Sequence, residues 1–258
     1  MPNLTRCGVL EPDPSALALV PALIDHGLPL DTYALMVDNT SLNFQPGLYR
    51  NNSLPDCTSV GVANAASFVA KLNGYDLIID RDKVPAFFAE CTGSSADNDA
   101  SMIATKGAQL LTVLRRQMIS GFDVGPQRLF GLFGAVGLKR SAMATAMTHL
   151  GHTWNGVRLF EREMENPAVW DIVPGRDDGK LIGGHCTVTT DYSGMTDDDV
   201  VRVATWGGWQ LATWAWIEAR TTESYALIWR QLASAAGVNV FVNTETLEAA
   251  LATGGDHG

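Results

Sequence analysis

The sequence predicts an α+β protein in which helices dominate the first half of the chain and β-strands the second. Residues 58–72 contain no proline and are mostly apolar, with a few polar side chains at helical spacing. After Gly125-Pro126 the chain changes to short apolar runs of β type. Because helices and strands are segregated and do not alternate, we expect α+β order and not a βαβ fold.

The segment Thr58–Leu72 predicts a central, buried helix. Its polar residues Asn64, Ser67 and Lys71 form one narrow stripe, and nearly every other position is Val, Ala, Gly or Phe. A helix that is apolar around most of its circumference belongs in a core. Asn73-Gly74 then supplies the left-handed stop that ends such a helix.

Two further helices and several strands complete this reading. The helices are expected at Arg81–Glu90 and Ser101–Ser120, and each is closed by a glycine, Gly93 or Gly121. The strands are expected at Gly134–Leu138, Val157–Phe160, Cys186–Thr190, Val200–Thr205 and Tyr225–Ile228.

A chain of 258 residues, 46% hydrophobic and 18% charged, has the composition of a packed globular protein. We interpret residues 1–45 as an N-terminal arm or wrapping segment, whose apolar run Ala16–Val20 needs cover from the domain surface or from a neighbouring subunit. Residues 46–235 form the main domain, with a helical lobe at about 46–125 and a β lobe at about 126–235. Residues 236–258 are read as a C-terminal helix and tail.

The net charge of −10 disfavours nucleic acid and anionic membrane surfaces as partners. No apolar stretch approaches the ~20 residues of a membrane span, and the N-terminus lacks the pattern of a secretory signal. We therefore expect synthesis in the cytoplasm.

No cofactor or metal is expected. The four cysteines are scattered and include no C-x-x-C pair, which argues against a disulfide framework and against a zinc site. His149 and His152 lack a third ligand, and Asp177-Asp178-Gly179 and Asp197-Asp198-Asp199 are typical of solvated turns.

Cys57 is the candidate nucleophile because it stands at the start of the buried helix. Pro55 and Asp56 are typical of a helix start, with Asp56 as a plausible N-cap. The helix dipole and the free N–H groups of the first turn favour a thiolate, whereas the Asp56 carboxylate opposes it. A protonated histidine nearby would complete the activation.

His185 is the candidate base. It opens a β-type run that the chain enters through Gly183-Gly184, and a sheet would hold its ring in place. Either residue alone is better explained as a core cysteine or a bonded strand histidine. As a pair, Cys57 and His185 favour the catalytic reading, with sulfur and ring nitrogen at about 3 to 4 Å across a cleft.

From about residue 46 to 230 the chain resembles the papain-like cysteine peptidases, and most closely the short papain-fold proteins encoded by phages and prophages. The resemblance rests on Asn51-x-x-x-x-Asp56-Cys57-Thr58, on Gly-Gly-His185, and on Val-Ala-Thr-Trp-Gly at 203–207. It implies a two-lobed fold, with the Cys57 helix in a helical lobe and the His185 strand in an antiparallel β lobe. It also implies that the Asn51 amide helps to bind the oxyanion.

The family's Asn-Ser-Trp-Gly motif is only partly matched. Thr205-Trp206-Gly207 fits its last three positions, but Ala204 stands where the family has the asparagine that orients the histidine. The resemblance implies that Trp206 shields the histidine from water, while Thr205 could replace the asparagine. Trp206, Trp209, Trp214 and Trp216 otherwise read as core packing.

Three functions stay open from the sequence. The first is a thiol hydrolase of the cysteine peptidase kind, acting on a peptide or protein substrate. The second is a catalytically weak or inactive papain-fold protein that is a structural or binding component of a phage particle, with other phage structural proteins as partners. The third is an acyl transfer enzyme that uses the same pair. In each case the N-terminal arm could block the cleft, as pro-segments do.

Overall fold

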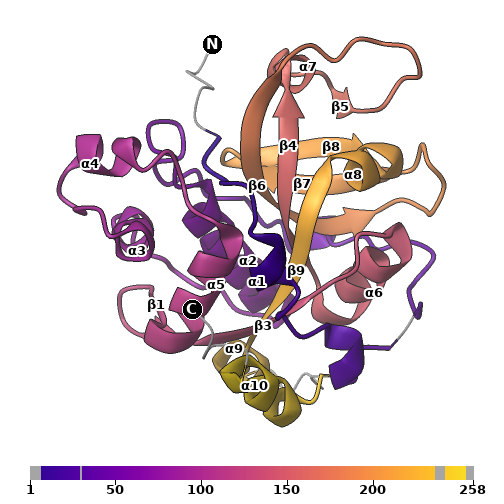
Figure 1. Cartoon of the computed structure of the whole chain (residues 1–258). Helices are drawn as coiled ribbons and strands as arrows, with labels where there is room; N and C mark the ends of the chain where they lie inside the picture. Colours follow the sequence, from indigo (N-terminus) through magenta and orange to yellow (C-terminus); the bar gives the residue numbers. More distant parts are fainter. Residues whose placement is uncertain (1–6, 30, 236–241, 254–258) are drawn as a thin grey trace.

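The computed structural model describes residues 7–29, 31–235 and 242–253. A group of helices lies on one side of the molecule and a twisted sheet on the other (Figure 1). The α+β order expected from the sequence is confirmed. The C-terminal helix and tail predicted at residues 236–258 fall partly outside the described residues, since 236–241 and 254–258 are not among them.

The helical lobe is built around α2, Cys57–Leu72, which begins one residue before the predicted start and ends at the predicted one. Twelve of its sixteen residues are buried, so the helix lies in the core as its composition predicts. The helices α3 (Lys83–Thr92) and α5 (Leu110–Ser120) pack against it, and α4 (Asp99–Ala104) packs against α3. The short hairpin of β1 (Phe122–Asp123) and β2 (Arg128–Leu129) follows.

The single helix predicted at Ser101–Ser120 is wrong, because the chain breaks between α4 and α5. Lys106 and Gly107 both have positive φ, +60° and +129°. The turn brings the backbone of Ala108 against the N-terminal segment, where its N–H donates to the Gly8 carbonyl at 2.8 Å. This long-range pairing overrides the local helical pattern.

The β lobe is a seven-stranded sheet in the order β3-β9-β4-β6-β7-β8-β5. Its pairs are antiparallel except β5 with β8, so the expected antiparallel lobe is confirmed. The strands are β3 (Gly131–Ala135), β4 (Thr153–Phe160), β5 (Val169–Trp170), β6 (Leu181–Tyr192), β7 (Val200–Thr205), β8 (Gly208–Thr213) and β9 (Thr221–Trp229). Only β7 has the predicted bounds, and β5 and β8 were not predicted.

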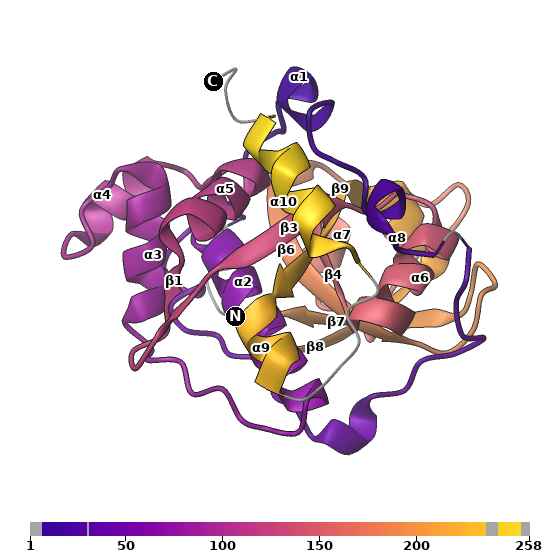
Figure 2. The ribbon, with the colours of Figure 1, turned by 90° about the horizontal axis from the view of Figure 1, so that it is seen from below.

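Helices also occur in the second half of the chain. They are α6 (Arg140–Leu150), α7 (Glu161–Met164), α8 (Trp214–Arg220), α9 (Arg230–Ala235) and α10 (Thr244–Thr253). In the view from below, α9 and α10 lie in front of the sheet (Figure 2), and α10 packs against β3. Among the described residues, no helix is both long and apolar enough to cross a bilayer.

The two lobes meet where α2 packs on β6 and β4. Gly61 lies at this contact, and a β-carbon added to it would come within 2.4 Å of Trp154 Nε1 and 2.7 Å of Cys186 Sγ. Real β-carbons do not approach other atoms so closely, so the helix reaches the sheet because residue 61 has no side chain. This contact fixes the start of α2 relative to the His185 strand.

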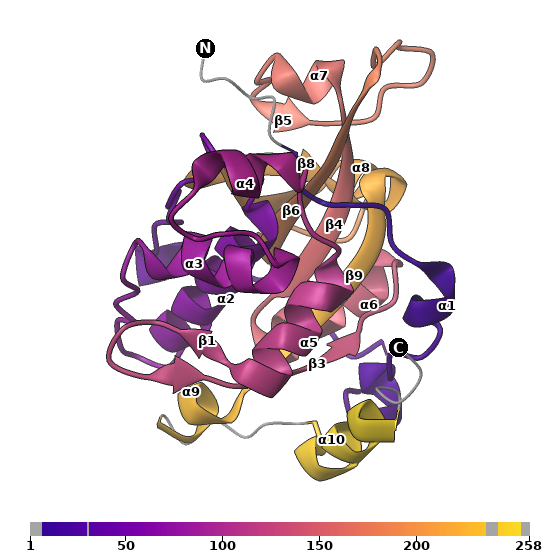
Figure 3. The same ribbon diagram turned by 60° about the vertical axis from the view of Figure 1, so that its left-hand side comes forward.

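The first described residues wrap around the chain's own domain. Val9 bridges Ala108 of the helical lobe and Gly184 of β6, Ala22 bridges Ala135, and Val37 bridges Tyr192. The short helices on this path are α1 (Pro14–Leu17), η1 (Leu23–His26) and η2 (Thr40–Leu42). Figure 3 shows the beginning of this segment passing between the helical lobe and β6.

Candidate active site

Cys57 occupies the first position of α2, as the sequence predicts. Asp56 is the N-cap residue, as the sequence predicts, but its side chain makes no capping hydrogen bond. Its Oδ1 accepts a hydrogen bond from Asn51 Nδ2 at 3.2 Å, and its Oδ2 makes no hydrogen bond within the described part of the chain. Burial raises the pKa of this carboxyl to about 7. An Asp56 side chain that is about half protonated near pH 7 would oppose a Cys57 thiolate less than a fully charged carboxylate would.

Asn51 is bonded within its own loop. Its Nδ2 donates to the Leu54 carbonyl at 3.3 Å and to Asp56 Oδ1 at 3.2 Å, and the residue is buried. The amide nitrogen carries two hydrogens, and both are directed at these acceptors. For Asn51 to bind an oxyanion, as the resemblance implies, at least one of these bonds must break.

His185 lies in β6 and is fully buried. A hydrogen bond of 2.8 Å joins its Nε2 to Thr205 Oγ1. The Trp206 ring stacks on the imidazole with centroids 4.4 Å apart and an angle of 24° between the planes. The ring is therefore held on one edge by Thr205 and on one face by Trp206, at the positions that the sequence singled out.

The turn between β7 and β8 places Trp206 on this face. Thr205 pairs with Gly208, and the two residues between them, Trp206 and Gly207, both have positive φ, +44° and +73°. Two left-handed residues in a two-residue hairpin are the signature of a type I′ turn. The other tryptophans of the predicted cluster are core or surface packing: Trp214 and Trp216 are fully buried, and Trp209 lies under Arg202.

The sulfur of Cys57 is covered. The residue is 1% exposed, and the backbone N–H groups of Cys186 and Gly8 donate to it. Burial raises the pKa of the thiol to about 12 despite these two donors, and burial lowers the pKa of the His185 imidazole to about 3. Both groups are therefore neutral near pH 7, and a thiolate–imidazolium pair is absent in this state.

The expected hydrogen bond between Cys57 and His185 is not formed. His185 Nδ1 is buried and makes no hydrogen bond among the described residues. The sulfur is satisfied instead by the two backbone donors. The sequence could not reveal this, because the donor at Gly8 is distant along the chain from both side chains.

The covering segment is an extended stretch from Cys7 to Leu10. Val9 N–H donates to the Gly184 carbonyl at 3.0 Å, and Leu10 N–H donates to the Ala108 carbonyl at 3.1 Å. The segment thus pairs by its backbone with both lobes. The sequence offered no specific signal for these contacts.

Two glycines allow the close fit of this segment. A β-carbon on Gly8 would lie 2.1 Å from the Pro55 carbonyl oxygen, and one on Gly107 would lie 2.0 Å from the Gly8 carbonyl oxygen. Gly8 is therefore pressed against the residues that precede Cys57.

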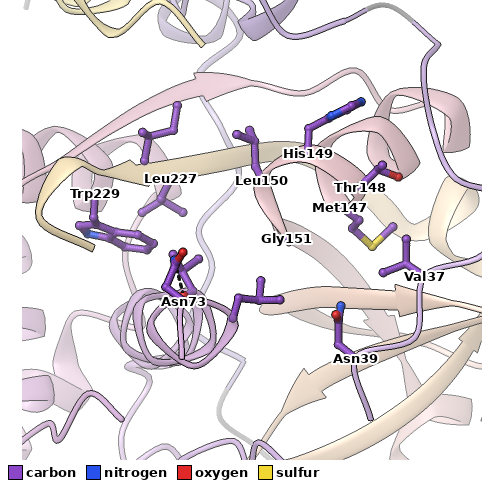
Figure 4. A pocket seen from close by; sticks show the side chains of 13 residues that line it. Val37, Asn39, Asn73, Met147, Thr148, His149, Leu150, Gly151, Leu227 and Trp229 are labelled. Carbon is purple, nitrogen blue, oxygen red and sulfur yellow. Dashed lines mark hydrogen bonds between the residues drawn. The ribbon is translucent and has the colours of Figure 1, made fainter. Parts of the chain in front are cut away.

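A separate pocket of about 270 Å³ lies at the other end of α2. In Figure 4 the end of α2, with Asn73, faces β9 and the end of α6 across it. Asn73 Nδ2 donates to the Val69 carbonyl, and its buried Oδ1 has no partner. Neither Cys57 nor His185 lines this pocket.

The other candidate sites of the sequence have structural partners. His149 Nε2 is bonded to the Thr32 carbonyl, and His152 Nε2 accepts a hydrogen bond from the Leu227 N–H. Asp197 and Asp178 form ion pairs with Arg140 and Arg220. In residues 7–29, 31–235 and 242–253, no group of three or more His, Cys, Asp or Glu side chains could hold a metal ion.

Comparison with protein-family models and with curated protein sequences finds no match. Solved structures do share the fold. Xylellain, a cysteine protease from Xylella fastidiosa, is 13% identical with a TM-score of 0.57, over 86% of this chain and 91% of that one. Procathepsin B S9 from Trypanosoma congolense is 11% identical with a TM-score of 0.60, over 88% and 87%. Procathepsin L 3 from Tenebrio molitor larval midgut is 11% identical with a TM-score of 0.57, over 88% and 77%.

These likenesses establish the architecture. The chain has the papain-like two-lobed α+β fold predicted from its sequence, with the Cys57 helix in the helical lobe and the His185 strand in the β lobe. At 11–13% identity the comparison concerns the fold alone.

Proposed function

We propose that this protein is a papain-type thiol hydrolase, a cysteine peptidase of peptide or isopeptide bonds, kept latent by its own residues 7–10. The observation that carries the proposal is the extended segment paired to both lobes over Cys57. A cleft that accepts an extended backbone through Gly184 and Ala108 is suited to a polypeptide substrate.

Cys57 is the proposed nucleophile and His185 the proposed base. If Nε2–H donates to Thr205 Oγ1, the lone pair of the unpartnered Nδ1 is free to take the proton of the thiol. The Cys186 N–H and the start of α2 then stabilise the thiolate. Thr205 takes the place of the missing asparagine, and Trp206 shields the imidazole from water.

The reaction follows from this arrangement. The thiolate attacks the substrate carbonyl carbon, and the backbone N–H of Cys57 stabilises the oxyanion, joined by Asn51 Nδ2 once it leaves Leu54 or Asp56. His185 passes the proton to the leaving amine, and water then hydrolyses the thioester.

Latency is the other part of the proposal. Gly8 faces the sulfur with its backbone N–H, which is a hydrogen-bond donor and not an electrophile. The segment also excludes water, which keeps thiol and imidazole neutral. Displacing the segment restores solvent and lets the two pKa values move toward each other.

Deleting residues 1–11 tests the proposal. The truncated protein should react with iodoacetamide selectively at Cys57 near pH 7 and should hydrolyse an unfolded protein substrate. Cys57→Ser and His185→Ala in the truncated background should abolish hydrolysis, with folding checked by circular dichroism. A folded truncated protein that is neither labelled at Cys57 nor hydrolytic would overturn the proposal.

The alternative is a catalytically weak or inactive papain-fold protein that is a binding or structural component, such as one of a phage particle. Ala204 at the position of the orienting asparagine favours it. In that case Cys57 stays unreactive after truncation. Adding an amine acceptor to the assay distinguishes acyl transfer, the remaining reading, from hydrolysis.

A further inference from the structure

Cys7 lies beside the covered nucleophile. It directly precedes Gly8, whose backbone N–H donates to the Cys57 sulfur. Its own side chain packs near Gly183 of β6, with its β-carbon 3.1 Å from where a β-carbon on Gly183 would stand. The α-carbon of Cys7 is therefore only two covalent bonds from the nitrogen that contacts Cys57. This proximity matters because a disulfide needs α-carbons within roughly 4.4–6.8 Å of each other.

A third thiol, Cys186, is also near but is held differently. Its sulfur packs against Gly61 of α2, since a β-carbon added to Gly61 would lie 2.7 Å from it. Cys186 is buried. Cys186 is fixed between a strand and a helix. Cys7 is only partly buried and belongs to a segment held to the lobes by a few backbone hydrogen bonds. Of the two thiols near Cys57, Cys7 is therefore the one whose backbone is less restrained.

We propose that Cys7 and Cys57 are joined by an intrachain disulfide when the protein meets a peroxide, and that this bond locks the segment over Cys57. The cross-link itself does not depend on the proposed function. Its consequence, a reversible block of catalysis, rests on the proposed function.

The chemistry is balanced with hydrogen peroxide as the oxidant. When the segment lifts, the Cys57 thiolate attacks the peroxide, forms a sulfenic acid and releases hydroxide, which takes up the proton lost by the thiol to give water. When the segment returns, the Cys7 sulfur attacks the sulfenic sulfur, an S–S bond forms, and a second water leaves with the Cys7 proton. Two thiols are oxidised by two electrons, and one peroxide is reduced to two waters. A dithiol reductant reverses the bond by thiol–disulfide exchange.

Peptide mapping of the full chain tests the cross-link directly. Trypsin places Cys7 in peptide 7–50, Cys57 in 51–71, Cys91 in 84–106 and Cys186 in 181–202, so every pairing has its own mass. After peroxide treatment and digestion without reductant, we expect peptide 7–50 linked to 51–71, with the link lost on reduction. It should be absent from Cys7→Ser and retained in Cys186→Ser, the matched control.

The alternative outcomes overturn the proposal. These are a link between 51–71 and 181–202, a link between two chains on a non-reducing gel, and irreversible oxidation of Cys57 while Cys7 stays a free thiol. A second readout is recovery: dithiothreitol should restore iodoacetamide labelling of Cys57 in oxidised wild type. Oxidised Cys7→Ser, which lacks the protecting partner, should recover poorly.

The cross-link and the proposed function fail independently. A cross-link in a protein that stays inactive after truncation contradicts the hydrolase alone. A truncated protein that hydrolyses substrate, in a chain that forms no such link, contradicts the disulfide alone.

Discussion

Trp206 is held in a backbone conformation that tryptophan rarely adopts. Its φ of +44° lies in the left-handed region, which costs a residue with a β-carbon roughly 1–2 kcal/mol. The type I′ turn imposes this conformation on it, and Gly207 takes the neighbouring position without strain. The same turn lays the indole on the face of His185. Local strain is thus coupled to the orientation of the candidate base, which is typical of functional sites.

Thr205 should decide how well His185 works. Thr205→Val keeps the shape but removes the hydroxyl 2.8 Å from Nε2, so the buried imidazole loses its orienting partner. In the truncated protein we expect hydrolysis to fall about 10- to 100-fold, which corresponds to one hydrogen bond to a group that becomes charged. Thr205→Ser, which keeps the hydroxyl, is the control. Equal rates for the two variants, measured by initial velocity, would contradict a positioning role.

The N-terminal segment is the element whose displacement should open the site. In Gly8→Ala the new methyl would point at the Pro55 carbonyl oxygen, 2.1 Å away, and a backbone oxygen cannot move aside easily. This overpacking should destabilise the bound position of the segment by about 1–3 kcal/mol and so raise the population in which the segment is displaced. We therefore expect iodoacetamide to alkylate Cys57 about 5- to 100-fold faster.

Gly137→Ala is the matched control for this variant. Its methyl meets only the Ala142 side chain, at 3.2 Å, in the connection between β3 and α6. Mass spectrometry of the 51–71 peptide over time gives both alkylation rates. If Gly8→Ala and Gly137→Ala react alike, the segment does not control access to Cys57.

The elements that the sequence predicted are those whose pattern is local. The proline-free, apolar stretch before Leu72 forms α2, and its first residue, Cys57, follows from Pro55 and Asp56. The sequence allowed that the N-terminal arm blocks the cleft, but the residues that do so depend on distant backbone pairing, which the sequence could not predict. The break before Ala108 and the cover on Cys57 both arise from the segment at Gly8, which has no side chain to form a pattern. The same segment accounts for His185 Nδ1, which makes no hydrogen bond among the described residues while the segment covers Cys57.

At the scale of the whole molecule, four buried side chains govern how stability depends on pH. Burial raises the pKa of Asp56 and Glu223 to about 7, and lowers that of His152 to about 4 and of His185 to about 3. Each carboxyl holds its proton when folded and loses it on unfolding, so stability falls as pH rises from about 4 to about 7. Each histidine gains a proton only on unfolding, so stability rises between about pH 4 and 6.5.

These opposite contributions nearly cancel, and the free energy of unfolding should be almost flat from about pH 4.5 to 6.5. Glu223→Gln removes one of the two carboxyl contributions that fall as pH rises. The free energy of unfolding of this variant should therefore rise by up to about 1.4 kcal/mol per pH unit in that window. His152→Gln removes one of the two histidine contributions that rise with pH. The free energy of unfolding of this variant should therefore fall with pH by a similar amount. Urea unfolding at half-unit pH steps measures both slopes. If the folded Glu223 carboxyl is protonated and the folded His152 imidazole is not, the two variants have pH slopes of opposite sign. Parallel pH profiles for the two variants would contradict these protonation states.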